Sequence, residues 1–186
     1  MTVPIDLDQR FRDAAAEAGM LDAAYDVIDS ELGPLLAAVT DRGLALITDD
    51  PDPEVELERL ARAAGPRVLR APRALDETRR ELDDYFAGRR RVFDLALDLR
   101  GQAPFAIAVL DELARVPYGH TATYGELATR AGNPRAARAV GMVMNRNPVP
   151  IVLPCHRIVG ASGSLVGYGG GLERKEKLLR LEGAIL

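Results

Sequence analysis

The stretch HTATYGELATRAGNPRAARAVGMVMN, residues 120–145, decides the fold of the second half of the chain, because it marks where two short helices begin and end. Thr123 followed by Glu126 forms a capping box, in which each side chain accepts a hydrogen bond from the other residue's free backbone N–H group. A helix is therefore predicted to begin at Tyr124.

A tight turn follows that helix. Gly132 suits the left-handed residue that closes a helix. Asn133 is a favourable N-cap for a second helix, and Pro134 fits its first position, where the missing N–H costs nothing. Two short helices joined by a glycine-containing turn predict a helix–turn–helix.

The second helix of this pair presents a basic face. Arg135, Arg138, Met142 and Asn145 are spaced by three or four residues and so share one side. Small residues elsewhere on the helix would let it approach a nucleic-acid groove closely. A helical hairpin packed inside a protein core, with its arginines in solvent, fits the same pattern, and both interpretations remain open at this point.

The only cysteine, Cys155, lies in PVPIVLPCHRIVG, residues 148–160. A lone cysteine is commonly a small buried hydrophobe, but three prolines stiffen this stretch and hold the thiol in a fixed position. His156 and Arg157 follow at once and offer groups that favour the reactive thiolate. For Arg157 a structural salt bridge is the expected role.

Glu182 supplies a candidate third member of a nucleophile–base–acid relay. It lies on the predicted last helix, residues 172–182, from which it is able to orient a histidine. Adjacent residues of an extended strand point to opposite faces, so we expect His156 to reach Cys155 through a water molecule.

The first half of the chain has strands and helices. Short apolar strands over 24–48 are separated by turn residues at 30–33 and 41–43, which predicts an antiparallel meander. Helical spacing follows over 53–64 and 75–87, and DLALDL at 94–99 alternates as a strand does. Residues 100–104 are the expected linker.

The predicted fold class is therefore α+β. Residues 1–22 are an amphipathic N-terminal extension outside the core pattern, and residues 23–100 a small N-terminal α/β domain with an antiparallel sheet. Residues 101–186 are a mostly helical, winged helix–turn–helix-like C-terminal domain.

The composition excludes several classes of protein. No apolar run approaches the roughly 20 residues that span a bilayer, and the N-terminus lacks a secretory or transit signal, so the cytoplasm is the expected location. One cysteine and two histidines make neither an internal disulfide nor a standard four-ligand zinc site, and we expect no metal. Residues 1–100 hold 14 Lys and Arg against 22 Asp and Glu, whereas residues 101–186 hold ten against six, so a contact with phosphates is expected in the second half.

Several segments resemble the O6-alkylguanine-DNA alkyltransferases, also called methylated-DNA–protein-cysteine methyltransferases. PCHR at 154–157 is preceded by NPVPIVL and followed by GYGGGLERKEKLLRLEG at 167–183, as in the active-site region of that family. VPYGHTATYGELATRAGNPRAARAVG is similar to the family's DNA-binding helices. The resemblance is specific over 104–183 and weaker over 25–47.

The resemblance implies direct-reversal DNA repair. Proteins of this family rotate a damaged guanine out of the duplex, and a thiolate then displaces the guanine from its O6-alkyl carbon. The S-alkylcysteine has no route back, so each molecule acts once and uses no cofactor. The implied partner is double-stranded DNA containing O6-alkylguanine, with O4-alkylthymine as a second substrate. The implied state is a monomer, and cooperativity on DNA stays open.

Carried over residue by residue, the resemblance makes Cys155 the nucleophile and alkyl acceptor and His156 the water-mediated base, with Glu182 fixing its tautomer. Asn147 matches the asparagine that ties the recognition helix to the active-site turn. Tyr124 matches the phenol that donates a proton toward the guanine and contacts the rotated phosphate.

Other positions match the family's DNA contacts and pocket. Arg138 corresponds to an arginine finger that enters the base stack from a helix in the minor groove. The other implied DNA contacts are Gly125, Asn133 and Arg135. The implied pocket is lined by Met144, Ile158, Tyr168 and Gly169, with the backbone carbonyls of residues 155 and 158 reading the guanine amino group.

Some features depart from the family or have a simpler explanation. Gly169 stands where several relatives have a serine, which leaves the tolerance for larger alkyl groups open. His120 is expected on the surface, and the arginines at 89–91 at a solvated helix end. Two alternative functions remain: a non-catalytic DNA-lesion binder, a type of relative that replaces the acceptor cysteine, and a helix–turn–helix transcription factor with a structural cysteine.

Overall fold

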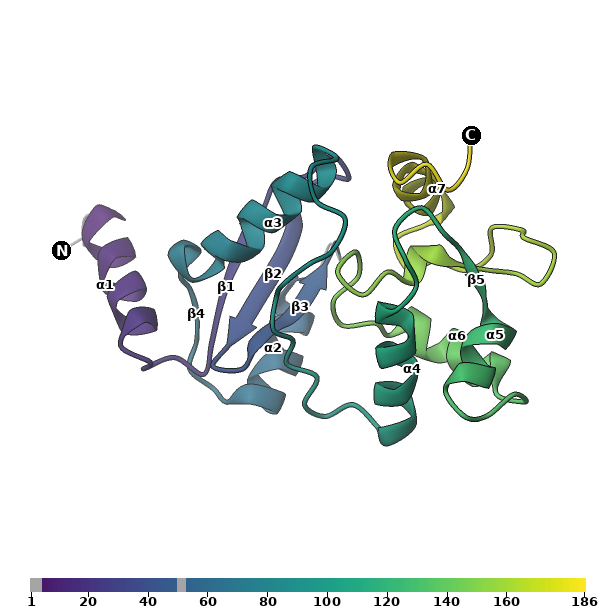
Figure 1. Cartoon of the computed structure of the whole chain (residues 1–186). Helices are drawn as coiled ribbons and strands as arrows, with labels where there is room; N and C mark the ends of the chain where they lie inside the picture. Colours follow the sequence, from purple (N-terminus) through teal and green to yellow (C-terminus); the bar gives the residue numbers. More distant parts are fainter. Residues whose placement is uncertain (1–4, 50–52) are drawn as a thin grey trace. The chain divides into compact units, whose positions relative to one another are not determined.

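The computed structural model describes residues 5–49 and 53–186, and the chain divides into two compact units, Met1–Gly101 and Gln102–Leu186 (Figure 1). The division lies one residue from the boundary that the sequence predicts. The first unit has strands and helices, and the second is mostly helical. The α+β prediction is therefore confirmed.

The first unit is built on a four-stranded sheet in the order β3-β2-β1-β4. β1 (Ala23–Ile28), β2 (Leu35–Thr40) and β3 (Gly43–Thr48) pair in antiparallel fashion, which confirms the predicted meander. β4 (Val68–Arg70) pairs with β1 in parallel and was not predicted. Three residues are too few to show a strand period.

Helices complete the first unit and bury the sheet. They are α1 (Ile5–Glu17), α2 (Pro53–Ala64), the short η1 (Pro72–Leu75) and α3 (Asp76–Phe86). Leu60 of α2 packs with Leu36, Ala38 and Leu46 in one apolar cluster, while η1 lies against β1 and β2. In Figure 1, α3 runs across the sheet. β2 is an almost continuous apolar run because it is a central strand of this covered sheet.

The predicted strand at 94–99 is wrong. Only Leu97 forms a bridge, to Leu44, through hydrogen bonds from Leu44 N–H to the Ala96 carbonyl (2.8 Å) and from Asp98 N–H to the Leu44 carbonyl (2.9 Å). The buried Asp98 instead accepts hydrogen bonds from Thr40 and Arg100. Because these side-chain hydrogen bonds hold the segment in place, it forms one β-bridge and not a longer strand.

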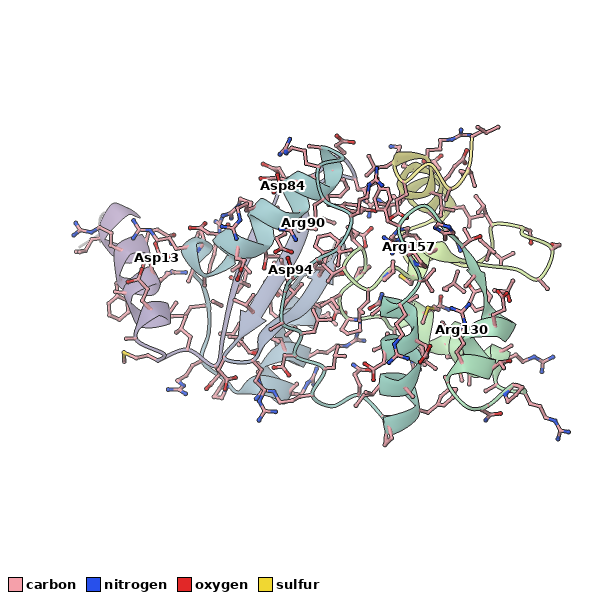
Figure 2. All side chains as sticks on the ribbon, in the orientation of Figure 1. Asp13, Asp84, Arg90, Asp94, Arg130 and Arg157 are labelled. Carbon is pink, nitrogen blue, oxygen red and sulfur yellow. The ribbon has the colours of Figure 1, made fainter. Side chains whose placement is uncertain are left out.

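Two further expectations for the first unit need correction. Residues 1–4 of the predicted extension lie outside the described residues, but α1 contacts η1, and its buried Asp13 pairs with Arg73 at 3.5 Å. Arg90 is not solely in solvent, since it pairs with the buried Glu81 at 3.3 Å and lies between the labelled Asp84 and Asp94 (Figure 2).

The second unit contains the helix–turn–helix. Its elements are α4 (Pro104–Ala114), β5 (Ala122–Thr123), α5 (Tyr124–Arg130), α6 (Ala137–Asn145), η2 (Cys155–Arg157), β6 (Ile158–Val159) and α7 (Leu172–Leu181). α4, α5 and α6 pack on one another, and β5 pairs with β6 in parallel. α7 packs against η2.

The start of α5 agrees with the sequence prediction, but the start of α6 does not. The capping box of Thr123 and Glu126 is complete, α5 begins at Tyr124, and Gly132 has φ of +82°. Asn133 does not cap α6. Its carbonyl accepts from Ala136 N–H in a turn, and α6 begins only at Ala137. The segment from Asn133 to Ala136, with Arg135, therefore precedes the helix.

Candidate active site

Cys155 opens a short 3₁₀ helix rather than lying in an extended strand, so the predicted strand geometry is wrong. Ile158 N–H donates to the Cys155 carbonyl and closes this single turn. The thiol residue is 6% exposed. The preceding turn contains Ile151 at φ of +77°, a conformation that a β-branched residue rarely adopts, so the surrounding bonds must hold it.

Asn147 supplies those bonds. Its side-chain amide donates to the Leu153 carbonyl (2.8 Å), and its oxygen accepts from Val149 N–H (3.2 Å). Asn147 also acts to lower the pKa of the Cys155 thiol and so favours its ionised form. One residue just after α6 thus fixes the turn and influences the sulfur.

His156 is fully buried, and its Nε2 lies 2.9 Å from Glu182 Oε1. Because a carboxylate only accepts hydrogen bonds, this contact places the imidazole proton on Nε2 and leaves Nδ1 as a lone-pair acceptor. Within the described part of the chain, Nδ1 has no hydrogen-bond partner. The tautomer is therefore the one that a general base requires.

Glu182 directly follows α7 and accepts from several donors. Arg157 donates to both carboxylate oxygens at 2.8 Å, and Gly119 N–H donates at 3.3 Å. The buried Arg157, labelled in Figure 2, also donates to the Val116 carbonyl (2.6 Å). The structural salt bridge predicted for Arg157 is confirmed, and it places a positive charge against the Glu182 carboxyl group that contacts the histidine.

Burial shifts both titrating groups toward their neutral forms. Desolvation raises the pKa of the Cys155 thiol, with partial compensation from Asn147, Lys175 and nearby backbone N–H groups. Desolvation lowers the pKa of His156, and the Glu182 contact opposes that shift. At neutral pH the resting pair is thus a thiol and a neutral imidazole.

Tyr124 begins α5 and faces the loop before α7. Its hydroxyl donates to the carbonyls of Val166 (3.2 Å) and Gly167 (3.4 Å). Burial, and secondly the nearby Cys155, raise the pKa of the phenol, so it remains a proton donor. Gly141 of α6 lies close to the ring, since a Cβ there would come within 3.9 Å of it.

The residues expected to contact DNA lie at or near the two helix starts. Arg138 and Met142 are exposed on α6, and Met142 is 58% exposed. Asn133 and Arg135 are exposed in the turn before α6. Gly125 is half-buried and lines a surface hollow with Thr129 and Pro134.

The expected pocket residues differ in burial. Met144 and Ile158 are buried, Tyr168 is half-buried and Gly169 is exposed, with no atom within 4 Å of the place where a Cβ would lie. The two carbonyls expected to read guanine each have one partner already: Ile158 N–H for Cys155 and the Lys175 ammonium for Ile158. A carbonyl has two lone pairs, so each retains one.

Lys175 is the site residue that the sequence reasoning missed. It stands among the charged residues of LERKEK, which are typical of an exposed helix face. The signal that could have found it is its position three and four residues before Leu178 and Leu179, on the buried face of α7. His120 is exposed, as predicted. Among residues 5–49 and 53–186, no group of three His, Cys, Asp or Glu is placed to hold a metal, and no helix is long and apolar enough to cross a membrane.

Fold and site together define a two-unit protein that joins a helix–turn–helix to a buried thiol flanked by a histidine–glutamate pair. Residues 23–99 match the family model of the 6-O-methylguanine DNA methyltransferase ribonuclease-like domain, and residues 104–184 match that of its DNA-binding domain. The chain belongs to this methyltransferase family.

Individual relatives agree with this assignment. The methylated-DNA–protein-cysteine methyltransferase of Methanosarcina acetivorans is 41% identical over 168 residues, covering 86% of this chain and 98% of that protein. The one from Mycobacterium tuberculosis is 42% identical over 158 residues, covering 85% of this chain and 91% of that protein. A crystal structure of Mycobacterium tuberculosis OGT in complex with DNA has a TM-score of 0.75 at 40% identity, covering 87% and 93%.

Proposed function

We propose that this protein repairs alkylated DNA by transferring the alkyl group of O6-alkylguanine to its own Cys155 in a single, irreversible turnover. The observation that carries the proposal is the buried Cys155, in a turn that Asn147 holds, next in the chain to the His156–Glu182 pair. This arrangement lies in the same unit as a capped helix–turn–helix. The names of the similar proteins and the DNA-bound relative support it.

The proposed reaction balances without a cofactor. The Cys155 thiol loses its proton, and the sulfur forms a bond to the alkyl carbon while the bond from that carbon to guanine O6 breaks. The electron pair of the broken bond stays on guanine, which takes up one proton and becomes ordinary guanine. The thioether product has no good leaving group, so the protein is consumed.

His156 acts as the base in this proposal. Its free Nδ1 lone pair accepts the thiol proton through one bridging water molecule, while Glu182 stabilises the imidazolium that forms. A base is required because burial keeps the thiol protonated at rest. Tyr124, whose phenol stays protonated, donates a proton toward the leaving guanine.

The helix–turn–helix delivers the base to the thiol. Arg138 on α6 fills the space left in the base stack, and Tyr124, Gly125, Asn133 and Arg135 contact the DNA around it. Met144, Ile158, Tyr168 and Gly169 line the pocket. We extend the substrate to O4-alkylthymine, which has the same alkyl ether on an exocyclic oxygen. The protein acts as a monomer, in the cytoplasm, where thiols stay reduced.

A turnover count tests the proposal. The protein is mixed with an excess of duplex containing one O6-methylguanine, and the restored guanine is counted against the protein added. We expect restoration to stop at one guanine per protein molecule. Tight binding to the modified duplex without restoration would instead indicate a lesion binder. A strict sequence preference with no discrimination for the modified base would indicate a transcription factor.

A further inference from the structure

Lys175 on α7 is a fully buried lysine with an unusual set of partners. Its ammonium donates to the carbonyl of Ile158 through a short hydrogen bond, to that of Val166 at 2.9 Å and to that of Gly167 at 3.5 Å. All three partners are backbone carbonyls. Among the described residues, no carboxylate pairs with this cation.

A buried ammonium without a carboxylate is costly to retain, because carbonyl dipoles replace water but do not neutralise the charge. The other buried cation of the second unit, Arg157, is paired with Glu182. Desolvation accordingly lowers the pKa of Lys175. Because no anion among the described residues pairs with Lys175 in the resting protein, its charge would be compensated by an anion that forms only during the reaction.

The candidate for that anion is the sulfur of Cys155. α7 packs against η2, the turn that begins at Cys155. Ile158 connects the two groups, because its N–H donates to the Cys155 carbonyl and its own carbonyl accepts from Lys175. We propose that Lys175 is a positioning residue for alkyl transfer, and that its buried ammonium is the counter-charge of the Cys155 thiolate. The inference rests on the proposed function, since it needs a reactive thiol.

The electrostatics of the site agree with this role. Lys175 lowers the pKa of Cys155, and Cys155 raises the pKa of Lys175. Lys175 also acts with burial and Arg157 to lower the pKa of His156. One cation thus favours both the thiolate and the neutral, proton-accepting imidazole.

The ammonium also holds the loop that Tyr124 contacts. Lys175 and the Tyr124 hydroxyl both donate to the carbonyls of Val166 and Gly167. Lys175 is therefore placed to hold the loop of Val166 and Gly167 in position beside both the Tyr124 phenol and the Cys155 turn. A purely structural lysine would hold the loop without altering the ionisation of Cys155, and this difference is measurable.

The test is the pH dependence of Cys155 alkylation by iodoacetamide, which needs no DNA. In Lys175→Met we expect a higher thiol pKa and a rate at pH 7 lower by about tenfold for each unit of that rise. Lys175→Arg, which retains the positive charge, is expected to recover most of the rate. Lys177→Met, on the exposed side of the same helix, should match the wild type. An unchanged thiol pKa in a folded Lys175→Met variant would overturn the inference.

A second measurement uses the unmutated chain, so the test does not depend on the variants folding. The Lys175 ammonium is titrated by NMR before and after Cys155 is methylated by a small reagent. We expect a lower lysine pKa after methylation, because the anion is gone; identical titrations would refute the counter-charge role. Since neither experiment uses alkylated DNA, failure here is distinct from a failure of guanine repair.

Discussion

His156 links the chemistry of the site to the stability of the fold, because it is buried in its neutral form. In the unfolded chain a histidine takes up a proton near pH 6.5, whereas burial lowers the pKa of His156 in the folded protein. Below pH 6.5 the unfolded state therefore binds more protons, and the free energy of unfolding falls as the pH falls, by up to about 1.4 kcal/mol per pH unit.

Urea unfolding between pH 7 and 5 measures this dependence. We expect His156→Gln to lose the pH-dependent part of the unfolding free energy in that range. His120→Gln, which alters an exposed histidine, should retain it. Asp98 contributes little to the pH dependence in this range, since hydrogen bonds from Arg100 and Thr40 outweigh burial and lower its pKa to about 2. Equal pH profiles for wild type and His156→Gln would contradict the account.

The grouping of His156 with Glu182 was readable from the sequence, and the structure places the two side chains 2.9 Å apart. The 3₁₀ turn at Cys155 was not readable, since it depends on Asn147 bonds across six residues. Lys175 was missed because its partners are carbonyls of residues 158, 166 and 167, which carry no side-chain signal.

The capping box of α5 is the element-scale feature that is easiest to test. Thr123 accepts from Glu126 N–H at 3.2 Å, and Glu126 accepts from Thr123 N–H at 2.7 Å. We expect Thr123→Ala to lower the unfolding free energy by about 1 kcal/mol. Thr121→Ala, an exposed threonine outside the cap, should change it little. Equal losses in urea unfolding would show that the box contributes nothing.

Arg138 on α6 is the subject of a separate prediction, because α6 is the helix proposed to enter the DNA groove. If its side chain replaces the extruded base, Arg138→Ala should slow repair of duplex DNA by roughly tenfold or more, because extrusion costs a few kcal/mol. Reaction with free O6-methylguanine should change little, since no base is extruded. Arg180→Ala, on the exposed side of α7, is the matched control. Equal losses on both substrates would count against the finger role.

Element boundaries were predictable where local chemistry determines them. The α5 start follows from two side chains three residues apart, and the meander follows from strand patterning between turn residues. The α6 start was mispredicted because Asn133 accepts from Ala136 in a turn that precedes the helix. The strand at 94–99 was mispredicted because the Asp98 side chain accepts hydrogen bonds from Thr40 and Arg100. These bonds hold the segment after one β-bridge, so it does not pair further as a strand.

The two halves of the molecule differ in charge, which predicts that the second half makes the contacts with DNA phosphates. The second half has four more basic than acidic residues, while the first half has eight more acidic than basic ones. Each phosphate neutralised contributes about −0.9 to the slope of log affinity against log salt. We expect Arg135→Ala to make that slope shallower by about one.

A variant in the first unit provides the control for this salt dependence. Arg89 is exposed and pairs with Asp84 at 2.7 Å, and Arg89→Ala should leave the slope unchanged. Fluorescence anisotropy of a labelled duplex at several salt concentrations measures both variants. A slope altered equally by the two substitutions would place DNA contacts on both units and contradict the proposed interface.

Peptide masses show whether Cys155 itself receives the alkyl group. The protein is incubated with duplex DNA containing one O6-methylguanine, digested, and analysed by mass spectrometry, with Cys155→Ser as the control. We expect one added methyl group on the peptide that contains Cys155, and none in the control. An unmodified Cys155 peptide, or a methyl group on any other residue, would contradict the proposed function.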